Sequence, residues 1–439
     1  MTSDKRRKAR IRSRMAKTGE RYTTARRHYV GAPPEERRDL GYALRSGQDP
    51  DSAALASVLR HHGVTGPDGV PLSEALMFGV MGGLGAGYIL WEFAAHNSAT
   101  LTLGFSNQWQ YTARGIRAAL DRLGIAVDEH ATGGATGAAR RLDAQIDAGR
   151  PALIWPDRQI LGHWHLPPYL EGGGGHTVVV YGRRDGRFHI DDRTLAPLTV
   201  PVDDLHRARA RVGSYRNLLL DPRPAPGPLE PDHLRAAVIA GIDECVRHLS
   251  ARSTSFSLPA WRKWGRLMTD QRNAKAWPRV FADGTGLVGA LMSVWEGTSQ
   301  SGMTGGHLRD LYADFLDEAA RLLDADFSAA ATALREAARQ WGVLADIAAG
   351  PQQAGFATLR ELTATVREAV AARGDAGRDE AGVAADELWR RREAADATCP
   401  LDDDTRAAVF ARMGETLQAI HDIETGAITE LARAADKVH

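Results

Sequence analysis

The chain has 439 residues, of which 43% are hydrophobic and 25% are charged, and its formal net charge is zero. This balance is ordinary for a globular protein and gives no overall field that would favour nucleic acid or a membrane surface. With two cysteines, no run of about 18 apolar residues and no apolar signal-peptide core, we expect a cytoplasmic protein without a disulfide framework or a membrane span.

Residues 1–45 form a basic arm, with 14 Lys and Arg against 5 Asp and Glu. The pattern over 8–29 predicts two short helices with a turn at Gly19. One interpretation is a helix pair that binds nucleic acid through residues 5–29. The other, which we favour, is a solvated basic tail or a cap over the acidic remainder of the chain.

Helices and strands follow in the order expected of an α+β domain at 46–221. A helix is predicted at 52–62, where Leu55, Val58 and Leu59 share a face. The glycine-rich run at 78–88 lacks a preceding strand and a following Lys-Ser or Lys-Thr, so it predicts close backbone packing and not a phosphate loop. Further helices are predicted at 112–123 and 137–148, and strands of a mostly antiparallel sheet at 125–127, 152–155, 177–181, 187–190 and 198–200.

The second half of the chain has a helical pattern. Single cores stop growing at about 250 to 300 residues, so a chain of this length predicts two domains. The proline-rich segment 222–230 is the expected linker and has no capacity to continue a sheet. Beyond it, an all-α bundle is predicted over 231–439, with helices at 234–249, 308–322, 356–374, 380–396 and 403–436.

The strongest candidate site is the pair His176 and Asp192. His176 follows four glycines and enters an apolar strand, and Asp192 leaves the next strand sixteen residues later. Papain-like folds pair a general base with its orienting carboxylate in this way, and Asp191 is the alternate because strand side chains alternate in direction. The same two residues could instead form a structural or ligand-binding pair. We favour this interpretation because a papain-like site needs a thiol nucleophile, which would be expected near residue 50, and no cysteine lies there.

Neither cysteine has the setting of a nucleophile. Cys245 lies on an apolar helical face and is expected to be buried, and Cys399 precedes a proline in a loop. His163 and His165 stand at alternate positions with Trp164 between them, but no further ligand lies at metal-binding spacing. We therefore expect a loop that lines the cleft, with no metal and no cofactor.

Other side chains carry weaker expectations. Arg193 and a basic cluster are expected either to receive a phosphopantetheine-type anion or to pair with Asp203 and Asp204; the cluster is Arg207, Arg209 and Arg211. Asp317 and Glu318 are expected to be solvated. The tryptophans of the second half are expected to pack in the core; they are Trp261, Trp264, Trp277, Trp295 and Trp341.

Four motifs carry a resemblance to a known family: SAALASVLRHHG, LSEALMFGVMGGLGAGY, GGGGHTVVVYG and IDDR. In this order and spacing they resemble the N-terminal domain of the butirosin-biosynthesis BtrH family, which is similar to bacteriocin-processing cysteine peptidases. The segments SLPAWRKWGRLMTDQRNAKAWPRVF and GMTGGHLRDLYADFLDEAARLL resemble its usual helical companion domain. The resemblance covers residues 45–330 and implies a papain-like α+β domain followed by a helical bundle.

The resemblance also implies an acyltransferase that carries an acyl group on a cysteine and passes it from a carrier-protein thioester to an amine. The family's His-Cys-Glu-Ser-Thr-Ala-Leu pattern matches residues 49–55, which puts Pro50 at the nucleophile position. Proline fits the first turn of a helix but offers no nucleophile. Gln48 stands where related peptidases have an oxyanion donor, although a polar turn explains it equally well, and Ser52 is expected to cap the helix.

These observations lead to three expectations for function. The first is a catalytically degenerate member, a pseudoenzyme of secondary metabolism or antibiotic biosynthesis, that binds an acyl carrier protein, a peptide or a small ligand in the cleft. The second is an acyl or peptidyl transferase in which His176 activates the acceptor amine for direct attack. The third is a DNA-binding accessory protein that uses the basic arm. The sequence leaves the oligomeric state open.

Overall fold

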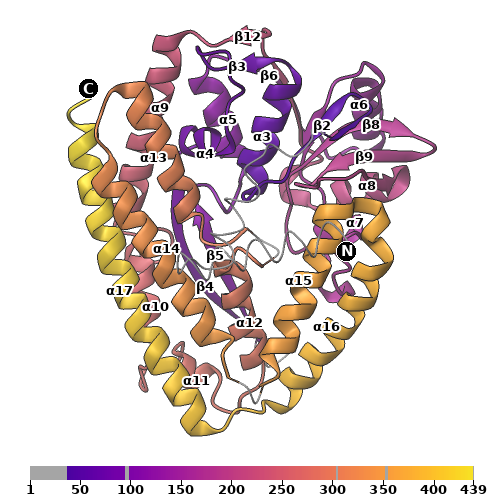
Figure 1. The fold of residues 1–439 in the computed structure, drawn as a ribbon. Coiled ribbons are helices and arrows are strands. Elements are labelled where there is room, and N and C mark those ends of the chain that lie inside the picture. The colour runs from indigo at the N-terminus through magenta and orange to yellow at the C-terminus, as the bar shows by residue number, and fades with distance from the viewer. Residues whose placement is uncertain (1–36, 94–97, 303–304, 352–353, 439) are drawn as a thin grey trace, which may run out of the picture.

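The structure, a computed structural model, describes residues 37–93, 98–302, 305–351 and 354–438. A mixed α/β region in the first half is followed by a mostly helical region (Figure 1), which confirms the predicted α+β class. None of the described helices is long and apolar enough to cross a membrane. The two helices predicted at 8–29 lie outside the described residues.

A six-stranded antiparallel sheet organises the first region. Its strands, in spatial order, are β10 (Leu198–Pro201), β9 (Arg187–Asp191), β8 (Val178–Arg184), β7 (Ala152–Ile154), β11 (Leu219–Arg223) and β6 (Ala126–His130). Alternate residues of β8 face opposite sides: Val179 belongs to the main core, whereas Val178 and Val180 belong to a smaller one. The continuous apolar run of this strand therefore reflects burial on both faces.

Helices cover both faces of the sheet. The smaller core includes residues of α6 (Ala135–Asp147) and α8 (Val202–Arg211). The main core includes residues of α3 (Pro50–His61), α4 (Glu74–Val80) and α5 (Ala113–Arg122). Short turns of helix complete the region: α7 (Arg158–Leu161), η2 (Pro168–Leu170) and η3 (Gly213–Tyr215).

Residues 222–230, which were predicted to be a linker unable to continue a sheet, contribute to two sheets. Pro222 of β11 pairs with Val127 of β6, and β12 (Gly227–Pro228) pairs in parallel with β3 (Val64–Thr65). That prediction was wrong. Pro222 is tolerated because it lies beyond Leu220, the last residue of β11 that pairs with β7, so the strand has only one neighbour there.

Two hairpins stand outside the main sheet. One joins β1 (Arg37–Asp39) to β2 (Tyr42–Leu44), and the longer one joins β4 (Leu84–Phe93) to β5 (Ser98–Ser106). The glycine-rich run spans the end of α4 and the start of β4, and its predicted close packing is confirmed. A Cβ at Gly79 would lie 2.2 Å from the Phe315 ring, and one at Gly83 would lie 2.1 Å from the Tyr312 ring.

The second region is helical, as predicted. Its described helices are α9 (Pro231–Leu249), α10 (Pro259–Leu267), α11 (Trp277–Val280), α12 (Leu287–Thr298), α13 (Arg309–Leu323), α14 (Ser328–Ala348), α15 (Phe356–Arg373), α16 (Arg378–Thr398) and α17 (Asp403–Ala435), with the turn η5 (Gly374–Gly377) between α15 and α16. In Figure 1, α17 runs along one side of the molecule, and the α15–α16 hairpin reaches the sheet region on the other.

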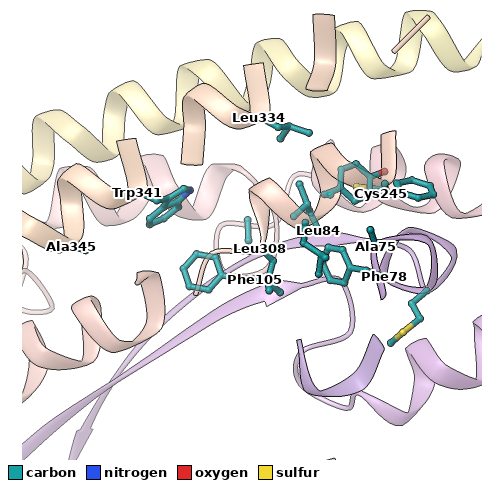
Figure 2. Packing of buried hydrophobic residues seen from close by; sticks show 14 of the residues in the cluster. Ala75, Phe78, Leu84, Phe105, Cys245, Leu308, Leu334, Trp341 and Ala345 are labelled. Atoms are coloured by element: carbon teal, nitrogen blue, oxygen red, sulfur yellow. The ribbon is translucent and has the colours of Figure 1, made fainter. Parts of the chain in front are cut away.

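A single core joins the two regions. Figure 2 shows Phe78 and Leu84 of the first region packed among helices that carry Cys245, Leu334 and Trp341. The predicted core positions of the tryptophans are confirmed, because all five are buried: Trp261, Trp264, Trp277, Trp295 and Trp341. The burial predicted for Cys245 is confirmed as well.

Candidate functional site

The site is built at the start of α3. Asp49 is the N-cap: its side chain accepts from the backbone N–H of Ser52, and Pro50 occupies the first turn. The prediction that Ser52 caps this helix was wrong, because the helix begins two residues earlier and the Ser52 hydroxyl donates to Asp49 at 2.9 Å. Proline is suited to this first position because the N–H that it lacks would have no helical partner there.

His176 and Asp192 lie in hydrogen-bond contact, with 2.8 Å between Nε2 of the imidazole and Oδ1 of the carboxylate. His176 enters β8 and Asp192 follows β9, the strand paired with it. Asp191 accepts from the Tyr42 hydroxyl at 3.0 Å and makes no contact of this kind with His176. Of the two candidate carboxylates, Asp192 is thus the partner of the histidine.

The Asp192 carboxylate is buried and accepts from four donors. Besides His176, these are Nε2 of His163 at 2.9 Å, the indole N–H of Trp164 at 2.8 Å and the guanidinium of Arg193 at 3.4 Å. Burial by itself would raise the pKa of Asp192, but its electrostatic interaction with His176 and the hydrogen bonds from the two imidazoles hold that pKa well below its usual range. The group is therefore a fixed anion.

Burial has the opposite consequence for His176. It lowers the pKa of the imidazole to about 4, although Asp192 works against this shift. At neutral pH the ring is uncharged, and because Nε2 donates to Asp192, the lone pair lies on Nδ1. The His176 side chain is only 12% exposed, so its imidazole is largely shielded from solvent.

A hydrogen bond connects the two halves of the site. The hydroxyl of Thr177, the residue after His176, donates to the carboxylate of Asp51, the residue after Pro50. Pro50, Asp192 and Arg193 also line one small hollow. The α3 terminus and the His176–Asp192 pair therefore belong to one site.

Three more carboxyl groups around this helix terminus titrate abnormally. Burial raises the pKa of Asp51 to about 7, helped by the charge of Asp49, and it raises the pKa of Asp191 to about 7. Burial likewise raises the pKa of Glu74 to about 7; this carboxylate accepts from the backbone N–H groups of Gln48 and Asp49. Carboxyl groups with a raised pKa are common at functional sites, which supports this helix terminus as part of the candidate site.

Gln48 is held as part of a turn. Its side-chain amide donates to the carbonyl of Gly305 at 3.1 Å, and its own carbonyl accepts from Arg193 at 3.0 Å. A Cβ at Gly305 would lie 2.0 Å from that carbonyl oxygen, so only glycine allows the approach. These contacts favour the polar-turn interpretation over that of an oxyanion donor.

A cavity of about 440 Å³ opens beside Pro50. Its apolar wall comes from β5 and from the residue before α13, with Leu101, Leu103, Phe105 and Leu308. Its polar lining includes Asp49, Asp51 and Glu296. The β4–β5 hairpin, absent from the sequence-based prediction, thus supplies one wall of the candidate site.

Several residues singled out in the sequence lie elsewhere. Arg209 is buried and donates to the carbonyls of Ala138 and Asn217, so it is not open to an anion. Arg207 does pair with Asp204, at 3.1 Å. The prediction of a solvated Glu318 was wrong, because its carboxylate accepts from the Ser73 hydroxyl at 2.8 Å.

The main omission of the sequence prediction is His163 and Trp164. Both were placed in a loop lining the cleft, whereas both side chains are buried and donate to Asp192. The His-Trp-His pattern is visible in the sequence, but no local pattern indicates that His163 contacts Asp192, which lies 29 residues further along the chain. Among the residues that the structure describes, no group of three or more His, Cys, Asp or Glu side chains could hold a metal ion.

Comparison with protein families gives two matches. The family described as "Butirosin biosynthesis protein H, N-terminal" matches residues 49–193, from the N-cap of α3 to the residue after Asp192. A "Domain of unknown function (DUF4872)" matches residues 203–379, from α8 to the first turn of α16. A search of curated proteins found no match.

Proposed function

Because this chain belongs to the BtrH N-terminal family and continues into a DUF4872 domain, we propose that it is a catalytically degenerate member of that family. In this proposal the first region is papain-like and its cavity binds a small ligand without covalent catalysis. His176 and Asp192 then act as a structural pair behind the cavity, connected to its lining residue Asp51 through Thr177, and no bond of the ligand is broken.

One observation carries the proposal: the residue at the nucleophile position of the resemblance, Pro50, lines the cavity and has no reactive atom. Ser52 does not replace it, since its hydroxyl is fully buried and bonded to Asp49. Cys245 does not replace it either, because burial raises the pKa of its thiol to about 11.

The size and lining of the cavity support a small molecule. About 440 Å³ lies within the usual range of about 300 to 1,000 Å³ for small-molecule pockets. Leu101, Leu103 and Phe105 offer apolar contact, and Asp51 offers a polar anchor at one side. An acyl group with a polar end matches this lining, whereas a peptide or an acyl carrier protein would have to present such a group.

The alternative, direct acyl transfer with His176 as general base, has weaker support. A base is most effective when its pKa lies near the working pH. The pKa of His176, lowered by burial to about 4, makes the imidazole neutral but a poor proton acceptor. DNA binding stays a prediction that rests on residues 5–29.

A thioester probe tests the proposal. The protein is incubated with butyryl-N-acetylcysteamine, an amine acceptor such as glycinamide is added, and intact mass, amide product and binding heat are measured. We expect reversible binding, no adduct within residues 45–62 and no amide. Amide formation would favour the transferase, and a stable acyl group on Ser52 would show a hidden nucleophile.

A pair of variants locates the binding. Leu103→Trp puts a larger side chain into the cavity, whereas Leu170→Trp changes an exposed leucine that does not line it. We expect Leu103→Trp to weaken probe binding at least tenfold and Leu170→Trp to leave it unchanged. Equal affinities in both variants, or no binding by the unmodified protein at millimolar probe, would overturn the proposed ligand site.

A further inference from the structure

Asp192 is shared by two imidazoles, and only one of them belongs to the pair described above. His176 forms its hydrogen bond with Oδ1 of Asp192, whereas His163 and the indole N–H of Trp164 both form theirs with Oδ2. The His163 side chain is 1% exposed, compared with 12% for His176, so the second imidazole cannot reach a ligand. Its contact with Asp192 therefore acts inside the protein.

We propose that His163 is a positioning residue: it donates Nε2–H to Asp192, fixes the plane of the carboxylate, and competes with His176 for the negative charge of that carboxylate. The proposal concerns the state of the site and does not depend on whether the cavity binds a ligand.

The surroundings of His163 set its tautomer. Nδ1 of His163 is buried and has no hydrogen-bond partner among the described residues. A proton on that nitrogen would be a buried donor without an acceptor, which costs about 1 to 3 kcal/mol. The Nε2–H form leaves only a lone pair there and satisfies Asp192, so the geometry selects this tautomer.

The second region fixes the loop that carries His163. The indole N–H of Trp389 on α16 donates to the carbonyl of His165 at 3.0 Å. A Cβ at Gly382, also on α16, would lie 3.1 Å from the His165 ring, so helix and loop are in close contact. Helix α16 therefore fixes the loop at His165, two residues from the imidazole that contacts Asp192.

The shared carboxylate bears on the protonation of His176. The other charged groups that act on this imidazole are Arg158 at the start of α7 and Arg193 after β9, and both oppose its protonation. On the α3 side, the Asp51 carboxylate is bonded to Thr177. When His163 draws on Oδ2, less of the Asp192 charge remains to stabilise a His176 imidazolium.

The test is a ¹⁵N and ¹³C NMR titration of the histidines in the full chain. His163→Phe keeps the ring volume but removes the donor, and we expect the midpoint of His176 to rise by about one pH unit. His163→Gln retains an N–H that can donate to Asp192, and its His176 midpoint should stay close to that of the unmodified protein. Packing alone would not separate these two variants in this way.

A second measurement needs no substitution. At pH 7.5 the ¹⁵N shifts of the unmodified protein should show His163 as the neutral Nε2–H tautomer. An Nδ1–H tautomer or an imidazolium at His163 would overturn the proposal, as would equal His176 midpoints in His163→Phe and the unmodified protein. If His163→Phe does not fold, the tautomer of His163 measured in the unmodified protein tests the proposal by itself.

Discussion

Pro50 is the residue on which the proposed function depends. It occupies the first turn of α3, where its missing N–H needs no helical partner, and its side chain offers no nucleophile. The neighbouring contacts remain in place around it: Asp51 is bonded to Thr177, and His176 to Asp192. A single substitution at Pro50 can therefore test whether the start of α3 and the His176–Asp192 pair have the relative geometry of a thiol site.

Pro50→Cys should place a thiol near His176. A thiolate beside His176 and the protonated imidazole would stabilise each other, so the pKa of the new Cys should fall below the ordinary value of about 8.5 while that of His176 rises above about 4. The measurement is the rate of iodoacetamide alkylation as a function of pH. The control is the same variant with His176→Ala, whose alkylation should shift to higher pH. Superimposable profiles would mean that the site geometry is not that of a thiol–imidazole pair.

At the scale of elements, the N-terminus of α3 gathers carboxyl groups whose burial works against their charge. Asp49, Asp51 and Glu74 all have a raised pKa, and Asp49 also caps the helix. A helix N-terminus stabilises negative charge, but these three carboxyl groups are buried next to one another, and burial disfavours their charged forms. Their titration should be visible in the stability of the protein.

The pKa values of Asp51 and Glu74, about 7 when folded, exceed ordinary values near 4. The folded state thus binds these protons more tightly, so the stability they give is complete below about pH 4 and is lost as the pH rises through about 7. We expect each of the two groups to lower the free energy of unfolding by roughly 2 to 3 kcal/mol between pH 5 and 8.

The check on this pH dependence is chemical denaturation at both pH values. Asp51→Asn should reduce the loss of stability, because it removes one of the buried acids. Asp185→Asn, at an exposed turn between β8 and β9, is the matched control and should leave the loss unchanged. A slope that Asp51→Asn does not alter would contradict the assignment.

The β4–β5 hairpin depends on two glycines that face each other across the strands. Gly87 pairs with Gly104, and the Trp109 ring lies over both. A Cβ at Gly104 would lie 2.2 Å from the indole, so Gly104→Ala must displace the ring, and we expect a loss of about 1 to 3 kcal/mol in stability.

Gly137→Ala is the control for this substitution. Gly137 is exposed within α6 and has no atom within 4 Å of its Cβ position, so alanine there should stabilise by about 0.5 to 1 kcal/mol. Urea unfolding of both variants gives the comparison. If Gly104→Ala is as stable as the unmodified protein, the indole does not lie on this surface.

At the scale of the whole molecule, a buried ion pair lies where several elements meet. Arg309 at the start of α13 donates to both oxygens of Glu424 on α17, at 2.7 and 2.8 Å, and to the carbonyl of Gly85 in β4. The indoles of Trp261 and Trp341 donate to the same carboxylate. Both charges are nearly inaccessible, at 0% and 1% exposure.

Removal of one partner should therefore be costly. Arg309→Met leaves the Glu424 charge buried and uncompensated, and we expect a loss of about 3 to 5 kcal/mol. Arg433→Met breaks an exposed pair with Glu430 and should cost no more than about 1 kcal/mol. Thermal unfolding measures both, and a similar small effect for the two variants would show that the buried pair does not stabilise the fold.

The continuous core also makes a prediction about cooperativity. Strand β11 lies within the DUF4872 match, yet it pairs with β6 and β7 of the other family match. The two regions should therefore unfold together. Six of the ten tryptophans lie in the helical region, so fluorescence and far-ultraviolet circular dichroism weight the two regions differently, and their unfolding curves should nevertheless coincide. Two separated transitions would show independent domains.

The sequence by itself determined the local features of this protein. It predicted the α+β order, a helix at 52–62 that proved to begin at Pro50, the burial of the tryptophans, and His176 and Asp192 as a pair, because strand and helix periods and the register of neighbouring strands are local properties. It also indicated the family, through four short motifs in order.

The tertiary structure alone decided which groups meet. His163 and Trp164 reach Asp192 across 28 or 29 residues, Glu318 accepts from a serine 245 residues away, and the β4–β5 hairpin forms the wall of the cavity. Pro222 enters a strand because only one neighbour is present there. No local period encodes such partners, since burial and hydrogen bonding between distant segments depend on the packed core that brings them together.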